Sequence, residues 1–318
     1  MKILLAGGAG YIGSLLIPKL LEHGYEVGVI DLLWFGNHLP KEVKVIEKDL
    51  FDCQQADFEG YDQVIFLAGL SNDPMAEFSP AMNFISNGAQ PSYLAYIAKL
   101  AGVKRFIYGS SCSVYGYTVN ELYDEGSPVT CGYPYGISKL QGERGVIQMQ
   151  DDNFSVIALR QGTVCGYSPR IRFDLIVNTM YKSCMVNGKV TVNNASIWRP
   201  LLDIRDATNA YLRAIQADQS ISGVFNVASD NYTVGQVGDM VKDQVEALTG
   251  QKIAIEIKNI QDFRNYKVTW KKAKTVLGYE PKYTVSDIIA DVHKHRDEYG
   301  DFEDDSYYNI RTFKKLKV

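Results

Sequence analysis

The chain has 318 residues, 46% of them hydrophobic and 22% charged, and its formal net charge is −4. This length allows one large domain or two moderate ones, and the absence of an interior basic block argues against a nucleic-acid partner. Five scattered cysteines lack the paired spacing of a metal site or a disulfide framework, so we expect no metal and a reducing, cytoplasmic location. Apolar runs are too short to cross a membrane, and the N-terminal one lacks a signal-peptide cleavage site, so we expect no membrane partner.

The N-terminal region carries the strongest pattern in the chain. Residues 1–6 form an apolar run that predicts a strand, and a glycine-rich turn and an apolar helical pattern follow it. Such glycines permit a tight turn, let the backbone approach a pyrophosphate and let the helix pack close to the strand. The helix N-terminus then presents unpaired N–H groups to the phosphates. We therefore predict a dinucleotide site that includes Gly7, Gly10, Tyr11, Ile12 and Gly13.

A second apolar run, residues 27–30, ends in Asp31, 18 residues beyond Gly13. A carboxylate at this place can accept both ribose hydroxyls of the adenosine half of a dinucleotide. A 2′-phosphate would meet a like charge there, and no Arg or Lys occurs within residues 31–37. The sequence therefore predicts NAD rather than NADP as the cofactor.

Strand and helix patterns alternate through the first half of the chain. This alternation predicts a doubly wound parallel sheet of the Rossmann type, with helices on both faces. Ligands of such sheets bind beyond the C-terminal ends of the strands, so the chemistry should follow residues 6, 68, 108 and 159. The predicted strands are 43–46, 63–68, 104–108 and 154–159, and the predicted helices are 83–101 and 135–150.

The second half is less regular. We expect a helix and a glycine-containing turn within 170–192, a helix over 208–217, a strand over 224–228, and amphipathic helices over 233–248 and 285–296. The last twenty residues show no clear pattern. We expect them to form an arm or loose tail without a function.

Two segments carry a reactive pattern: 109–116, directly after a strand, and 133–139, which opens a helix. Tyr135 and Lys139 are four apart and share a helix face, and of the 21 tyrosines only Tyr135 has a Lys at this spacing. An ammonium roughly 4 Å from a phenol favours the phenolate by about 4 kcal/mol, which lowers the pKa by about 3. Tyr135 could then take the proton of a sugar hydroxyl while a serine hydroxyl holds the substrate oxygen.

The glycine fingerprint, the Ser-Ser-x-x-Val-Tyr-Gly run and Tyr-x-x-x-Lys together resemble the extended short-chain dehydrogenase/reductases that act on nucleotide sugars, the epimerase/dehydratase type. The resemblance extends to about residue 296. It implies a catalytic Ser111, with Ser110 as the fallback, beside Tyr135 and Lys139. It also implies further cofactor contacts by Asp49, Leu50, Leu67, Ala68, Gly69 and Asn87, although Phe66 stands where the family has His.

The resemblance further implies a substrate-binding set. A guanidinium can bind phosphate oxygens bidentately, so arginines suit a sugar diphosphate. The dehydratases of this family have Asp and Glu after their catalytic Thr, whereas Cys112 and Ser113 stand here, so a dehydratase is disfavoured. Cys112 is either a weak acid/base for a second epimerisation or simply a small buried residue. The candidate substrate contacts are Ser111, Cys112, Thr163, Arg170, Arg172, Arg199 and Arg264.

We interpret the chain as an NAD-dependent 4-epimerase of a nucleotide-diphosphate sugar that acts through a transient 4-keto intermediate. The alternative is an NAD-dependent C4 dehydrogenase or 4-keto reductase on such a sugar. A non-catalytic NAD sensor or scaffold is disfavoured by the intact Ser111, Tyr135 and Lys139. The expected organisation is an NAD-binding domain over 1–165, to which 201–230 returns, and a smaller C-terminal nucleotide-sugar-binding domain over 166–200 and 231–318. The resemblance also implies a homodimer through helices 83–101 and 135–150.

Overall fold

The structure is a computed structural model that describes residues 1–259 and 264–317. Its largest sheet is fully parallel and has seven strands: β1 (Lys2–Ala6), β2 (Glu26–Asp31), β3 (Lys44–Glu47), β4 (Gln63–Phe66), β5 (Arg105–Ser111), β7 (Ser155–Gln161) and β11 (Gly223–Val227). Their spatial order is β11-β7-β5-β4-β1-β2-β3, so the direction of winding reverses between β1 and β4. Ligands of such sheets bind at this reversal, beyond the C-terminal strand ends. The predicted Rossmann-type fold is confirmed.

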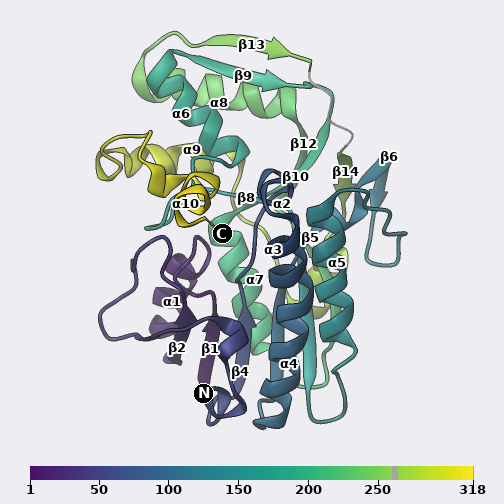
Figure 1. Cartoon of the computed structure of the whole chain (residues 1–318). Coiled ribbons are helices and arrows are strands. Elements are labelled where there is room, and N and C mark those ends of the chain that lie inside the picture. The colour runs from purple at the N-terminus through teal and green to yellow at the C-terminus, as the bar shows by residue number, and fades with distance from the viewer. Residues whose placement is uncertain (260–263, 318) are drawn as a thin grey trace.

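Helices cover both faces of this sheet (Figure 1). On β1, Ile3 and Leu5 join one buried apolar cluster while Leu4 and Ala6 join another, so both faces of the strand are covered. This two-sided burial explains why the strand is a continuous apolar run rather than an alternating one. The cover on one face comes from α1 (Gly13–Glu22) and α7 (Ile204–Gln216), and on the other from α4 (Gln90–Leu100) and α5 (Pro134–Ile147).

The predicted helix over 83–101 is not continuous. It consists of α3 (Pro80–Phe84), a π-helical turn η3 (Ile85–Ala89) and α4, and the short α2 (Asp73–Phe78) precedes it. Pro91 has no N–H to donate to the carbonyl four residues earlier, that of Asn87. The Asn87 carbonyl instead accepts a hydrogen bond from the Tyr108 hydroxyl at 3.0 Å. The irregular turn thus ties this helix to the central strand β5.

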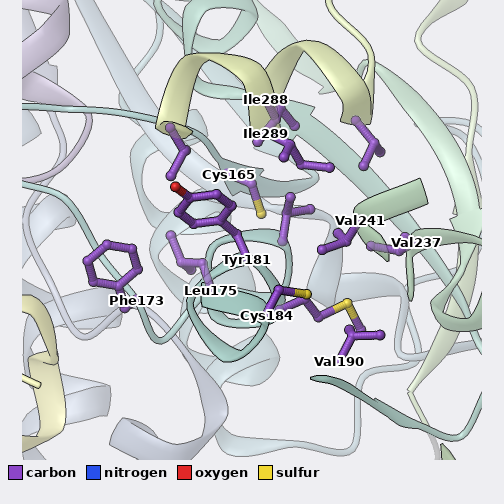
Figure 2. Close-up of a cluster of buried hydrophobic side chains, with 14 of the residues drawn as sticks. Cys165, Phe173, Leu175, Tyr181, Cys184, Val190, Val237, Val241, Ile288 and Ile289 are labelled. Carbon is purple, nitrogen blue, oxygen red and sulfur yellow. The ribbon is translucent and has the colours of Figure 1, made fainter. Parts of the chain in front are cut away.

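The second half of the chain adds a smaller group of elements beyond the C-terminal edge of the sheet (Figure 1). Its core is an apolar cluster between helices and strands, part of which Figure 2 shows around Tyr181 and Cys184. This group comprises α6 (Ile176–Asn187), β9 (Lys189–Asn193), α8 (Val234–Thr249), β13 (Ala254–Lys258) and α9 (Val285–Lys294). The remaining strands are β6 (Tyr117–Tyr123), β8 (Thr163–Cys165), β10 (Trp198–Asp203), β12 (Asp230–Thr233) and β14 (Asn265–Val268). Within 1–259 and 264–317, no helix is both long and apolar enough to cross a membrane.

The C-terminal segment is ordered by packing, so the expectation of a loose tail is wrong. A short turn, η7 (Asp305–Tyr307), leads into α10 (Asn309–Leu316). Phe313 of this helix is 3% exposed and lies edge-on to Trp34, with 5.2 Å between ring centroids. The apolar residues Ile310, Phe313 and Leu316 do recur at helical spacing, but the helix is short and its packing partners are far away in the sequence.

Candidate active site

A cavity of about 640 Å³ lies at the C-terminal ends of β1, β4, β5 and β7. Most of the predicted site residues line it. The glycine turn contributes Gly7, Gly10, Tyr11, Ile12 and Gly13, and the later segments contribute Asp31, Asp49, Leu50, Leu67, Ala68, Gly69, Ser111, Tyr135, Thr163, Arg170, Arg172, Arg199 and Arg264. The predicted residues Asn87, Cys112 and Lys139 do not line it. Lining residues that sequence reasoning missed include Trp34, Phe35, Ser71, Gln161, Asn309 and Phe313.

The glycine turn, residues 7–13, leaves no room for side chains at Gly7 and Gly13, and we call this turn the glycine cradle. Gly7 has φ of +79°, and a Cβ on it would lie 2.5 Å from the backbone nitrogen of Ala68. A Cβ on Gly13 would lie 2.1 Å from the carbonyl oxygen of Gly8. No side chain caps the N-terminus of α1, so its backbone faces the cavity directly. These residues fit the pyrophosphate of a dinucleotide, which needs close backbone approach and a helix N-terminus.

Asp31 lies at the end of β2, where the adenosine ribose was expected. Its Oδ2 accepts a hydrogen bond from the Ala9 N–H at 2.9 Å, and its Oδ1 accepts one from the Leu33 N–H at 2.8 Å. Burial raises the pKa of Asp31, and these backbone hydrogen bonds partly offset that effect. A carboxylate has about four acceptor sites, so both oxygens can still accept ribose hydroxyls.

Two hydroxyls come together at the end of β5. Pro134 occupies the first turn of α5, where its fixed φ suits a helix start, and this places Tyr135 at the cavity wall. The Ser111 side chain is close enough to the Tyr135 phenol to lower its pKa, and the Ser111 hydroxyl donates to the Ser113 hydroxyl at 3.1 Å. The Ser110 hydroxyl instead donates to the Glu143 carboxylate at 2.7 Å. The geometry therefore favours Ser111 over Ser110 as the hydroxyl that meets a substrate.

Lys139 lies behind this pair rather than in the cavity. Its amine is 4.7 Å from the centroid of the Tyr108 ring, and the residue is 6% exposed. Burial lowers the pKa of Lys139 to about 7, while the nearby Glu143 carboxylate acts in the opposite direction. Burial also raises the pKa of Tyr135, and the nearby Ser111 side chain offsets this only in part. The expected acidification of Tyr135 by Lys139 alone is absent, because the desolvation of the phenol dominates.

Asn87 supports the cavity wall from behind. Its side chain is fully buried and donates to the Leu70 carbonyl at 2.8 Å and to the Asn83 side chain at 2.9 Å. A Cβ on Gly69, which has φ of +116°, would lie 2.1 Å from the Asn87 oxygen. Asn87 thus fixes the turn that follows β4, and the turn itself faces the cavity.

A buried ion pair that sequence reasoning missed joins α5 to β7. Glu143 accepts two hydrogen bonds from the guanidinium of Arg160, at 2.7 and 2.9 Å, and both side chains are at most 6% exposed. Arg160 also donates to the Tyr115 hydroxyl at 2.8 Å. Glu143 lies four residues after Lys139, so the helix periodicity could have pointed to it.

Three of the four candidate diphosphate arginines, Arg172, Arg199 and Arg264, already have protein partners. Arg264 forms an ion pair with Asp73, with Nη1 and Oδ2 2.6 Å apart, and Arg172 binds Asp174 through two nitrogens at 2.9 and 2.8 Å. The Arg199 guanidinium lies 5.6 Å from the centroid of the Tyr266 ring and donates to the Arg264 carbonyl. A diphosphate at this end of the cavity would compete with the carboxylates for these cations.

Cys112 is fully buried outside the cavity, and its thiol donates to the Arg160 carbonyl at 3.1 Å. Burial raises the pKa of the Cys112 thiol, which disfavours proton transfer by it. We expect Cys112→Ala to keep turnover within about twofold of the wild type and to cost about 1 kcal/mol in the free energy of unfolding. Initial rates and urea unfolding check both, with Cys165→Ala as a buried control. A folded Cys112→Ala variant with a tenfold loss of turnover would restore a chemical role for the thiol.

The glycine cradle shares its cavity with Ser111 and Tyr135, and Lys139 is buried behind them. This arrangement defines a dinucleotide-dependent enzyme of the extended short-chain dehydrogenase/reductase type. The family model "NAD dependent epimerase/dehydratase family" matches residues 3–228, and the chain belongs to this family. This family is NAD dependent, so NAD is the cofactor, as predicted.

Individual relatives match nearly the full chain. It is 27% identical to a UDP-glucose 4-epimerase of Lactobacillus helveticus, over 96% of this chain and 100% of the relative. A UDP-glucose 4-epimerase from Thermotoga maritima, solved with UDP-glucose, has a TM-score of 0.83 and 26% identity, and covers 94% of this chain and 99% of its own. MoeE5 in complex with UDP-glucuronic acid and NAD shares the fold, with a TM-score of 0.83 at 24% identity over 94% of this chain and 100% of its own.

Proposed function

We propose that the protein inverts C4 of a nucleotide-diphosphate sugar through a transient 4-keto intermediate. The observation that carries the proposal is the position of Ser111 and Tyr135 on the wall of one cavity, which also includes the glycine cradle. Full-length relatives named UDP-glucose 4-epimerase support the same reaction and favour a UDP-sugar as the substrate.

Each residue has a role that its position allows. The Ser111 hydroxyl holds the C4 oxygen of the sugar, and the Tyr135 phenolate takes the C4 hydroxyl proton and later returns it. When bound, NAD supplies the hydride acceptor, and its positively charged ring favours the phenolate that burial alone disfavours. Lys139, in its protonated form, would add to this charge from behind the cavity wall. Arg199 and Arg264, at the far part of the cavity, suit the sugar diphosphate.

The test is to supply UDP-glucose and UDP-galactose, and then the GDP-, dTDP- and CDP-sugars, while product stereochemistry and NADH absorbance are followed together. We expect a C4 epimer to accumulate without net formation of NADH, because the hydride returns to the sugar. Protein with Tyr135→Phe serves as the blank for contaminating host enzymes. NADH formed or consumed in proportion to product would instead indicate a C4 dehydrogenase or 4-keto reductase. The absence of C4 exchange with every sugar would overturn the proposal.

A further inference from the structure

The C-terminal helix α10 forms part of the cavity wall. Asn309 and Phe313 line the cavity, and Phe313 packs against Trp34 and Phe35 from the loop after β2, with the Phe35 ring centroid 5.9 Å away. Leu70 and Met75, which follow β4, complete this small apolar cluster. Figure 1 shows α10 between the α1 side of the sheet and the smaller group of elements. The helix therefore bridges the rim of the site.

Arg170 lies beneath this helix as a buried cation without a carboxylate partner among the described residues. It is 3% exposed, its guanidinium is 3.8 Å from the centroid of the Phe35 ring, and its Nη2 donates to the Asn309 side chain. Its Nε and Nη1 have no hydrogen-bond partner within 1–259 and 264–317. By contrast, Arg172 two residues later is neutralised by Asp174. Burial, with the nearby charge of Arg172, lowers the pKa of Arg170 to about 9, although the Asp174 and Asp31 carboxylates act in the opposite direction from beyond ion-pair distance.

An unpaired buried charge costs several kcal/mol unless something compensates it. Arg170 lines the cavity, so an anionic ligand can reach it. Such a ligand would accept charge-assisted hydrogen bonds from the unpaired nitrogens, as phosphate oxygens do.

Hydrogen bonds join the segment just before Arg170 to the glycine turn, and this position bears on which diphosphate Arg170 can reach. The Ser168 hydroxyl donates to the Tyr11 carbonyl at 2.7 Å, and the Tyr11 hydroxyl donates to the Gly166 carbonyl at 2.7 Å. Phe35, on which Arg170 stacks, comes four residues after Asp31. These contacts place Arg170 beside the cofactor cradle, whereas Arg199 and Arg264 come from the segments around β10 and β14.

We propose that Arg170, held by Asn309 of α10, binds the diphosphate of the dinucleotide rather than that of the sugar, and that α10 thereby retains the cofactor between turnovers. Asn309 is the positioning residue, because it also donates to the Ser71 hydroxyl at 3.1 Å and so joins α10 to the turn after β4. This proposal requires NAD but no particular sugar, so its tests are independent of whether the protein epimerises C4.

The first test measures nucleotide affinity of Arg170→Met, with the full chain stripped of nucleotide and titrated with NADH and with UDP. Loss of a charge-assisted contact should weaken NADH binding about 10- to 100-fold and leave UDP binding unchanged. The matched variant Arg264→Met should show NADH binding within about twofold of the wild type. The nucleotide-free Arg170→Met protein should melt no lower than the wild type, because an uncompensated buried charge has been removed. NADH affinity within twofold of the wild type in Arg170→Met would overturn the proposal, and weaker UDP binding at unchanged NADH affinity would assign Arg170 to the sugar diphosphate.

The second test measures the rate at which NADH leaves the protein, by displacement with excess NAD. Asn309→Ala removes the polar link of α10, and Phe313→Ala removes its apolar contact. We expect both to release NADH about tenfold faster. Lys314→Ala, on the exposed face of the same helix, should release it at the wild-type rate. Thermal unfolding checks that each variant is folded. Unchanged release from folded Asn309→Ala would overturn the role of α10, even if Phe313→Ala proves unstable.

Discussion

Tyr135→Phe is expected to lower turnover about 10²- to 10⁴-fold, the range for removal of a general acid–base group. The substitution deletes only the hydroxyl, whose pKa Ser111 lowers, and keeps the ring that forms the cavity wall. NADH affinity should therefore stay within about threefold of the wild type, since the glycine cradle is untouched. Steady-state rates with the sugar found to react, together with NADH titration, measure both quantities.

The matched control is Tyr96→Phe, which removes a phenolic hydroxyl from an exposed position on α4. Its turnover should equal that of the wild type within about twofold. If Tyr135→Phe turned over as fast as this control, Tyr135 would not be the proton-transfer group. The proposed roles of Ser111 and Lys139 would then lose their basis.

Glu143→Ala is expected to destabilise the protein by about 3–5 kcal/mol, which is the range for removal of one partner of a buried ion pair. The substitution leaves the guanidinium of Arg160 buried without its carboxylate. It also removes the acceptor of the Ser110 hydroxyl, which lies next to Ser111. Urea unfolding followed by circular dichroism measures the loss of stability.

Glu280→Ala is the control for this loss, since its ion pair with Lys274 is exposed on both sides. Removal of a surface pair of this kind should cost less than about 1 kcal/mol. Equal unfolding midpoints for Glu143→Ala and Glu280→Ala would show that the buried network contributes no more than a surface pair. Glu143→Gln, which keeps the shape and removes the charge, separates hydrogen bonding from ion pairing.

Local sequence patterns predicted the sheet, the glycine turn and the residue types of the site. Gly7 is required by its positive φ and Gly13 by its contact with Gly8, and such short-range constraints are visible as spacing. The i, i+4 spacing of Tyr135 and Lys139 could be read for the same reason. However, spacing does not give orientation, and Lys139 and Asn87 act from behind the cavity wall instead of lining it.

The pKa of Tyr135 shows what the sequence could not supply. A nearby ammonium lowers the pKa of a phenol, and the expectation from spacing rested on this effect alone. The folded protein removes the phenol from water, and this desolvation raises the pKa by more than Ser111 lowers it. The burial of a side chain depends on every element packed around it, so it cannot be predicted from the neighbouring residues in the sequence.

By itself, the sequence determined that a parallel α/β sheet holds NAD, because periodicity and glycine geometry are properties of neighbouring residues, and the family resemblance implied that Ser111 lies near Tyr135. Only the tertiary structure decided that residues 309–316 close the site and that Arg170 lies beneath them with two nitrogens unpaired among the described residues. Contacts between residues more than 100 positions apart, such as Arg170 with Asn309 and Trp34 with Phe313, arise from packing, and local periodicity carries no record of them.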